Sequence, residues 1–152
     1  MGMEGLEELR RRACRMASED SRIAGVILFG SRARGEENLR SDTDILILWD
    51  DSYSPGATGY RQAYTLASRH FSPSRGLTVL EMGYSEFLGA RRLTPILLNI
   101  IGDGVVLYDR HGRLEQFISD VRRRLRRRGV VRVKMGRYYY WELPEPGAKI
   151  VV

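Results

Sequence analysis

Two apolar runs separated by a short connector constrain the fold more than any other feature of the sequence. Ile23–Phe29 is apolar at odd and even positions alike, and Asp44–Trp49 is apolar in the same way after its opening acid. A strand with one face in water alternates apolar and polar residues, whereas a strand covered on both faces is apolar throughout. The two runs therefore predict two buried strands with other elements packed on both sides.

The connector between these runs ends in an Asp-Thr-Asp triplet. Side chains two positions apart on a strand point the same way, so Asp42 and Asp44 are expected to present their carboxylates on one face. Two anions in this arrangement repel each other unless they are solvated or share a cation, and Mg²⁺ prefers carboxylate oxygens. The triplet is therefore a candidate site for Mg²⁺, with two ions as in metal-assisted phosphoryl displacement. An exposed loop is the alternative interpretation of the triplet alone.

Gly30-Ser31 begins the connector and is the second half of the candidate site. Its backbone N–H groups and hydroxyl are suited to phosphate oxygens, and Gly30 lets the backbone approach a ligand closely. Arg32 and Arg34 add charge-assisted contacts to a polyphosphate. A glycine-serine turn by itself is common, and only its spacing from the aspartates favours a nucleotide site.

Helical and strand periodicities alternate along the rest of the chain. We expect helices over residues 3–17, 60–71, 96–101 and 114–125, and strands over residues 77–82 and 105–108. Thr94 and Pro95 are typical of a helix start, and Gly129 is typical of a helix end. The alternation predicts one α/β (α+β) domain over residues 1–152, in which helices pack against a small sheet and residues 130–152 form a C-terminal strand and aromatic tail.

Composition restricts the class of protein. The 152 residues are 43% hydrophobic and 29% charged, which excludes a disordered or collagen-like chain, and no apolar run is long enough for a membrane span. The formal net charge is +6, and only Lys134 and Lys149 are lysines, so arginine dominates and anionic partners are favoured. Cys14 is the single cysteine, and its place in an amphipathic helix predicts a buried thiol. That usage, and an N-terminus without the layout of a signal peptide, predict a cytoplasmic protein.

The spacing of the connector resembles that of the nucleotidyltransferase superfamily related to DNA polymerase β, in particular its minimal nucleotidyltransferases. The residues that carry the resemblance are Gly30, Ser31, Gly35, Asp42 and Asp44, and the segments Pro95–Tyr108 and Gly136–Leu143 are similar to later parts of the family. The resemblance implies a mixed sheet flanked by helices, with ATP or another nucleoside triphosphate bound at Gly30-Ser31. It also implies Mg²⁺ on Asp42 and Asp44, attack of an acceptor hydroxyl on the α-phosphate, and release of pyrophosphate.

One position departs from the family pattern. Active members place a third acid on the third strand, where this chain has Thr78, and a hydroxyl is a poor substitute for a carboxylate as a base or a metal ligand. Glu81 is a tentative catalytic replacement, but strand parity puts it on the opposite face from Thr78, so a bulge would be required. Glu81 is otherwise a strand-end acid that faces solvent. Glu36 and Glu37, in the connector, are further candidates for the missing third acid.

Three functions remain open. The first is an enzyme that transfers AMP to an acceptor, and the resemblance implies a tyrosine of a HEPN-type toxin as that acceptor. The second is a catalytically impaired antitoxin subunit that acts by docking. The third, least favoured, is an RNA-binding module that uses Arg122–Arg128, a run that is equally typical of a solvated last helical turn. The aromatic residues Tyr138–Trp141 are expected to pack in the core, and the small sheet is compatible with a homodimer or a heteromer.

Overall fold

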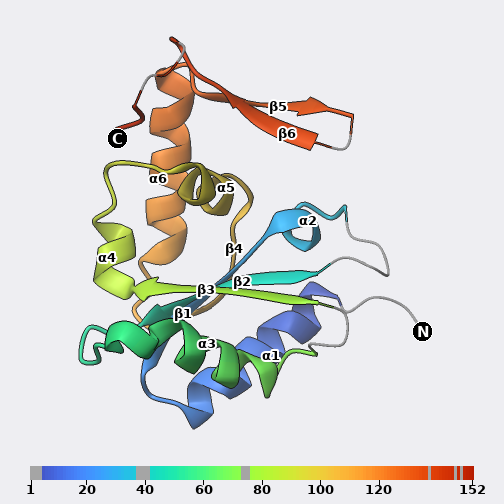
Figure 1. Ribbon diagram of the computed structural model, residues 1–152, viewed down its shortest axis with the longest axis vertical. Coiled ribbons are helices and arrows are strands. Elements are labelled where there is room, and N and C mark those ends of the chain that lie inside the picture. The colour runs from blue at the N-terminus through green and yellow to red at the C-terminus, as the bar shows by residue number, and fades with distance from the viewer. Residues whose placement is uncertain (1–4, 37–41, 73–75, 137, 146, 148) are drawn as a thin grey trace.

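A computed structural model describes residues 5–36, 42–72, 76–136, 138–145, 147 and 149–152 (Figure 1). The helices are α1 (Leu6–Glu19), α2 (Gly30–Ala33), α3 (Gly59–Ser68), α4 (Tyr84–Leu88), α5 (Pro95–Asp103) and α6 (Leu114–Arg127), with a 3₁₀ turn η1 (Gly56–Thr58). The strands are β1 (Ile23–Phe29), β2 (Thr43–Trp49), β3 (Leu77–Gly83), β4 (Val105–Asp109), β5 (Val131–Met135) and β6 (Tyr138–Glu142). β1–β4 form one sheet, and β5 and β6 form a separate hairpin.

The main sheet is mixed, with the strand order β3-β2-β1-β4. β1 pairs antiparallel with both β2 and β4, and β2 pairs parallel with β3. Every residue of β1 is buried, and so are six of the seven residues of β2, in which Asp44 is partly buried. The two apolar runs are therefore the central strands of the sheet, which confirms the prediction that both are covered on two faces.

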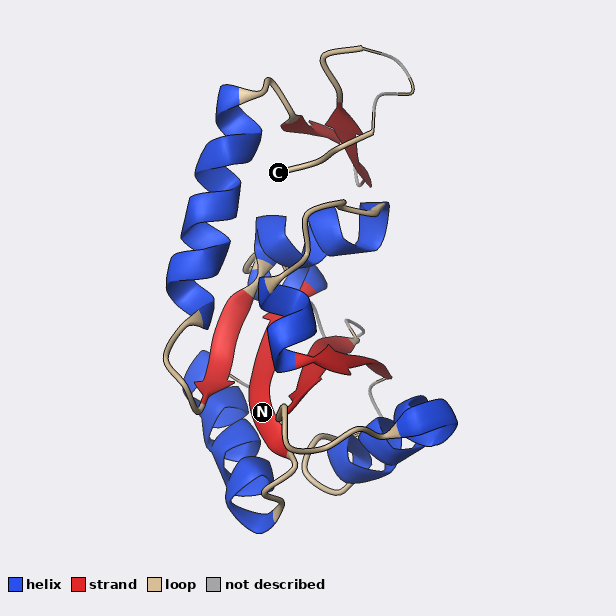
Figure 2. Cartoon of the chain, turned by 90° about the vertical axis from the view of Figure 1, so that its left-hand side faces the viewer, coloured by secondary structure: helices blue, strands red, loops and turns tan. Residues whose placement is uncertain are grey.

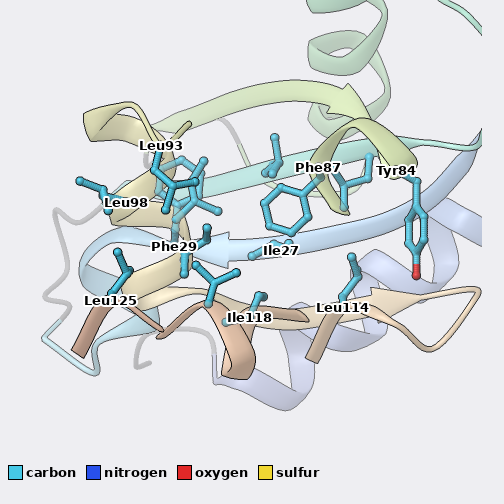
Figure 3. Close-up of a cluster of buried hydrophobic side chains, with 14 of the residues drawn as sticks. Ile27, Phe29, Tyr84, Phe87, Leu93, Leu98, Leu114, Ile118 and Leu125 are labelled. Carbon is cyan, nitrogen blue, oxygen red and sulfur yellow. The ribbon is translucent and has the colours of Figure 1, made fainter. Parts of the chain in front are cut away.

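Two hydrophobic clusters lie on opposite faces of the sheet. On one face, α1 and α3 cover a cluster that includes Met16, Ile47 and Ala63. On the other face, α4, α5 and α6 close over the cluster drawn in Figure 3, in which Phe87 and Ile118 approach Ile27. Figure 2 shows α6 running alongside the sheet toward the hairpin. The predicted small sheet with helices packed against it is confirmed.

The helix boundaries follow from local chemistry. Thr94 accepts a hydrogen bond from the Leu97 backbone N–H (3.4 Å) at the start of α5, and Pro95 occupies the first helical position. α6 begins where Asp109 Oδ2 accepts a hydrogen bond from the Leu114 N–H (2.9 Å). It is followed by Gly129 in the left-handed region, with φ of 73°, as predicted for a helix end.

Four differences separate the structure from these expectations. Tyr138 and Tyr140 are exposed on β6, so the prediction that the aromatic residues Tyr138–Trp141 pack in the core is wrong for these two. Cys14 is exposed, so the prediction of a buried thiol is wrong: Ala13, Met16 and Ala17 form the buried side of α1, and position 14 lies outside it. The five-residue helix α4 is too short to give a periodic signal and was not predicted. The second helix ends at Ser68, before the expected residue 71. Residues 3 and 4 of the expected first helix lie outside the described residues.

None of the helices in the described ranges is long and apolar enough to cross a membrane.

Replacing Ile118 by alanine is expected to lower the free energy of unfolding by about 2–4 kcal/mol, because the residue is buried between α6 and the sheet and the change leaves a cavity. Urea denaturation measures this. The control is Ser119→Ala on the exposed side of the same helix, for which we expect a change within about 0.5 kcal/mol. Similar losses in the two variants would contradict the assignment of the α6 core face.

Candidate functional site

The Gly30 turn and the Asp44 carboxylate are in direct contact. The last residue of β1, Phe29, pairs with Asp44 on β2, and the chain then turns into α2 at Gly30 with φ of 77°. A Cβ atom at Gly30 would collide with Asp44 Oδ2, so only glycine leaves room for the acid. The structure therefore brings together the two halves of the site that the sequence predicted.

Asp42 and Asp44 form an electrostatically unfavourable pair. Asp44 is half-buried, and burial, followed by the charge of Asp42, raises its pKa, while a hydrogen bond from Thr78 and the charges of Arg34 and Arg32 oppose the rise. Asp42 is exposed just before β2, where its Oδ1 occupies the space that a side chain at position 76 would fill. Two neighbouring carboxylates whose repulsion is not fully offset are a fitting donor set for Mg²⁺.

Thr78 is the residue of β3 that pairs in register with Asp44. This register places a threonine, rather than an acid, beside Asp44, and its hydroxyl opposes the rise in the pKa of Asp44. Across the part of the chain that the structure describes, no group of three or more His, Cys, Asp or Glu residues could hold a metal ion.

The structure does not bring Glu81 to this pair. Glu81 pairs with Ile47, and the β2–β3 register runs without a bulge from Thr43 to Trp49, so the acid faces the side of the sheet covered by α3. Its Oε1 accepts a hydrogen bond from the indole Nε1 of Trp49 (2.8 Å) and lies against Gly59. Strand parity is thus confirmed, and Glu81 is partly buried as the partner of a tryptophan.

Arg32 is the most unusual charged residue of the loop. It is 7% exposed, and its Nε and Nη1 atoms are buried without a hydrogen-bond partner. A buried charge that lacks a partner costs several kcal/mol, and such groups in native proteins need an explanation such as a missing ligand. The geometry fits an anion bound at α2, as predicted for the phosphate groups of a nucleotide.

Arg34 is held by two carboxylates. Its Nε donates to Glu36 (2.6 Å) and its Nη1 donates to Asp103 (2.8 Å), which lies at the end of α5. The pKa of Glu36 falls to about 2, first through a hydrogen bond from Tyr139 and then through Arg34 and Lys134. Glu36 therefore belongs to an ion-pair network and is a weak base, and Glu37 lies outside the described residues.

Sequence reasoning missed Asp103 and Tyr139 as parts of this neighbourhood. Asp103 was visible only as one residue of a Gly-Asp-Gly helix end, and Tyr139 only as one of four successive aromatic residues. They lie 69 and 103 positions from their partners on the loop, so no local pattern connects them. Only the tertiary fold makes them neighbours of the loop.

The arginine run of α6 has a mixed role. Arg122 donates to the carbonyl oxygens of Ile101 (2.8 Å) and Gly104 (2.9 Å), and burial lowers its pKa. Leu125 is buried in the core, while residues 123, 124 and 126–128 are exposed. The first arginine is thus structural, and the exposed ones form the solvated end of the helix.

Two alanine substitutions test the contact between Gly30 and Asp44. Gly30→Ala and Gly35→Ala introduce the same backbone strain, but only the first also introduces a clash with Asp44. Both positions have a left-handed φ, 77° and 72°, but a Cβ at Gly35 meets nothing within 4 Å. We expect Gly35→Ala to lower the free energy of unfolding by about 1 kcal/mol, and Gly30→Ala to lower it by roughly 1–3 kcal/mol more. Urea denaturation of both variants checks this, and equal losses would show that the acid does not occupy the space beside Gly30.

Comparison with known proteins identifies related chains. The family model described as Polymerase beta, Nucleotidyltransferase matches residues 13–113. No curated protein matches this chain.

Several solved structures are similar to it at low identity. A putative nucleotidyltransferase from Sulfolobus solfataricus is 20% identical, with 70% of this chain and 82% of that chain covered and a TM-score of 0.47. A toxin-antitoxin structure with AMP-PNP is 18% identical, with coverages of 79% and 92% and a TM-score of 0.47. A complex of tri-AMPylated Shewanella oneidensis HEPN toxin with MNT antitoxin is 16% identical, with coverages of 82% and 92% and a TM-score of 0.46. Because the family model covers well over half of the sequence, this chain belongs to the polymerase β nucleotidyltransferase family.

Proposed function

We propose that this protein is a Mg²⁺-dependent nucleotidyltransferase that moves AMP from ATP to an acceptor hydroxyl and releases pyrophosphate. The observation that carries the proposal is the contact between Gly30 and Asp44, because a carboxylate that could hold Mg²⁺ lies directly against a turn that could bind phosphate. Membership of the polymerase β nucleotidyltransferase family gives the class of reaction. The site residues below follow from the geometry and from the sequence motif.

Asp42 and Asp44 would hold Mg²⁺ through their carboxylate oxygens. Bound there, Mg²⁺ would neutralise charge that develops on the phosphate oxygens during transfer. Burial, and then the charge of Asp42, raises the pKa of Asp44, and this supports the assignment because a shared cation would stabilise both carboxylates in their charged form.

The loop would bind the triphosphate. The backbone N–H groups and the hydroxyl at Gly30-Ser31 would donate to phosphate oxygens, and the unpartnered guanidinium of Arg32 and the guanidinium of Arg34 would add charge-assisted hydrogen bonds. The acceptor hydroxyl gives its proton to solvent, and its oxygen forms a bond to the α-phosphorus while the bond from that phosphorus to the pyrophosphate oxygen breaks. The protein contributes mainly by positioning the reactants and by electrostatic stabilisation.

The acceptor we favour is a tyrosine hydroxyl of a HEPN-type toxin partner. This follows from the family resemblance, and one of the similar solved structures is described as an AMPylated HEPN toxin in complex with an antitoxin. We infer that residues 1–152 form a single cytoplasmic transferase domain with a C-terminal tail over 130–152. Such a domain would work as a heteromer with its acceptor, or as a homodimer.

A second candidate is a catalytically impaired antitoxin subunit that acts by docking. The presence of Thr78 beside Asp44 favours it, because the described ranges hold no third acid at that place to take the acceptor's proton or complete the metal site. The two candidates differ in whether any nucleotide is transferred.

Transfer of label from α-labelled ATP to a HEPN-type partner in the presence of Mg²⁺ tests the proposal. We expect Asp44→Asn to lower the transfer rate by about 10²-fold or more, because it removes a charge that holds the metal. Glu81→Gln, an acid-to-amide change on the other face of the sheet, is the matched control and should transfer within about twofold of wild type. Transfer that survives Asp44→Asn would refute the proposed role of Asp44 as a metal ligand. A tight complex with no transfer at all would refute the enzyme and favour the docking subunit.

Thr78→Asp tests whether the threonine limits catalysis. The new carboxylate would lie beside Asp44 on the same face of the sheet, so we expect a higher transfer rate at saturating Mg²⁺. The rate measured against Thr78→Asn, which has the same size without the charge, isolates the effect of the acid. An equal or lower rate for the aspartate would mean that a third carboxylate is not what the site lacks.

A further inference from the structure

The hairpin β5–β6 lies beyond residues 13–113, the part of the chain that the family model matches. Its strands pair antiparallel in a sheet of their own, and an isolated two-stranded hairpin is at best marginally stable. Contacts with the rest of the chain must therefore fix it. One face carries Arg132, Lys134, Tyr139 and Trp141, which all bond to the body, and the other face exposes Met135 and Tyr138.

Helix α5 anchors this hairpin. The indole Nε1 of Trp141 donates to Asn99 Oδ1 (2.9 Å), and the indole ring packs so closely on Gly102 that a Cβ there would lie 2.9 Å from the ring. Arg132 forms a two-point ion pair with Asp103, in which Nη2 lies 2.9 Å from Oδ2. The side chain of Asp103 is only 3% exposed, so this ion pair is a rigid base for the hairpin.

From this anchor the hairpin reaches the loop that follows α2. The Tyr139 hydroxyl donates a hydrogen bond to the carboxylate of Glu36, whose two oxygens lie 2.6 and 2.8 Å away. Lys134 Nζ lies 3.2 Å from the same carboxylate. Glu36 and Asp103 both bind Arg34. The Arg34 side chain is therefore held between α5 and a carboxylate that the hairpin keeps in place, as the proximity of α2 and the hairpin in Figure 1 illustrates.

Cations gather around the Tyr139 ring. Arg34, Arg132 and Lys134 lie 4.6, 4.3 and 5.7 Å from its centroid, and among the described residues the carboxylates of Glu36 and Asp103 pair with them directly, while the charge of Asp44 also acts on Arg34. Within the described ranges, the second terminal nitrogen of Arg34, Nη2, donates to no protein acceptor. One edge of a fixed guanidinium thus remains for an anion.

We propose that the β5–β6 hairpin is part of the nucleotide site, and that Tyr139 is a positioning residue that acts through Glu36 to hold Arg34 ready for the triphosphate. This inference rests on the proposed function. A guanidinium that is fixed before the ligand arrives loses less conformational entropy on binding, so affinity depends on the groups that fix it. The hairpin thereby links a segment outside the matched family region to the phosphate loop.

Tyr139→Phe removes the hydroxyl and keeps the ring. Calorimetric titration with ATP and Mg²⁺ should show an affinity about 3- to 10-fold weaker than wild type, the range expected for loss of a hydrogen bond to a charged group at one remove from the ligand. Tyr140→Phe makes the same change on the opposite face of β6 and should bind ATP within about twofold of wild type. Glu36→Gln breaks the same link from the loop side and should weaken binding to a similar extent.

A double-mutant cycle separates positioning from general stabilisation. In an Arg34→Ala background, Tyr139→Phe should cause no further loss of ATP affinity, because the group it positions is absent. A hydroxyl that only stabilised the fold would reduce affinity by the same factor in both backgrounds.

The outcomes distinguish this inference from the proposed function. If wild type does not bind ATP with Mg²⁺, the proposed function fails and this inference fails with it. If wild type binds, but Tyr139→Phe matches Tyr140→Phe or loses the same factor with and without Arg34, only the role of the hairpin is overturned.

Discussion

The contact of Asp44 with the backbone of Gly30 is the constraint on which the rest of the site depends. The pairing of Phe29 with Asp44 fixes this contact, since it brings the start of one central strand opposite the end of the other. Because the core holds these strands on both faces, neither the acid nor the turn can move independently. The contact requires a left-handed backbone conformation at Gly30, which glycine adopts with little strain.

The charges around this contact are complementary to a ligand that carries both signs. The two aspartates repel each other, and the Nε and Nη1 atoms of Arg32 are buried without a hydrogen-bond partner. A metal ion would relieve the first and a phosphate group the second, so a metal–triphosphate complex fits both. The hairpin network adds a third, partly balanced cluster around Arg34, at the point where the loop leaves α2.

Much of this arrangement could be predicted from local patterns. The central strands follow from runs that are apolar at odd and even positions alike. The start of α5 follows from Thr94 and Pro95, and the end of α6 follows from Gly129. Strand parity predicts that Glu81 lies on the face of the sheet opposite to Thr78. These features depend on residues within a few positions of one another.

Other features could not be predicted in this way. The prediction that Cys14 is buried was wrong because the buried side of α1 does not include position 14. The indole that binds Glu81 and the contacts of Tyr139 with Glu36 join segments 32 and 103 residues apart, for which a single sequence holds no signal. The roles of Asp42 and Asp44 as metal ligands, and of Arg32 and Arg34 as nucleotide contacts, remain predictions.

A crystal structure with a non-hydrolysable ATP analogue and Mg²⁺ tests the central claim most directly. The account predicts Mg²⁺ at about 2.1 Å from a carboxylate oxygen of both Asp42 and Asp44, with the triphosphate on the backbone of Gly30-Ser31. A nucleotide bound elsewhere on the chain, or two aspartates that turn away from each other with no shared ion, would contradict it.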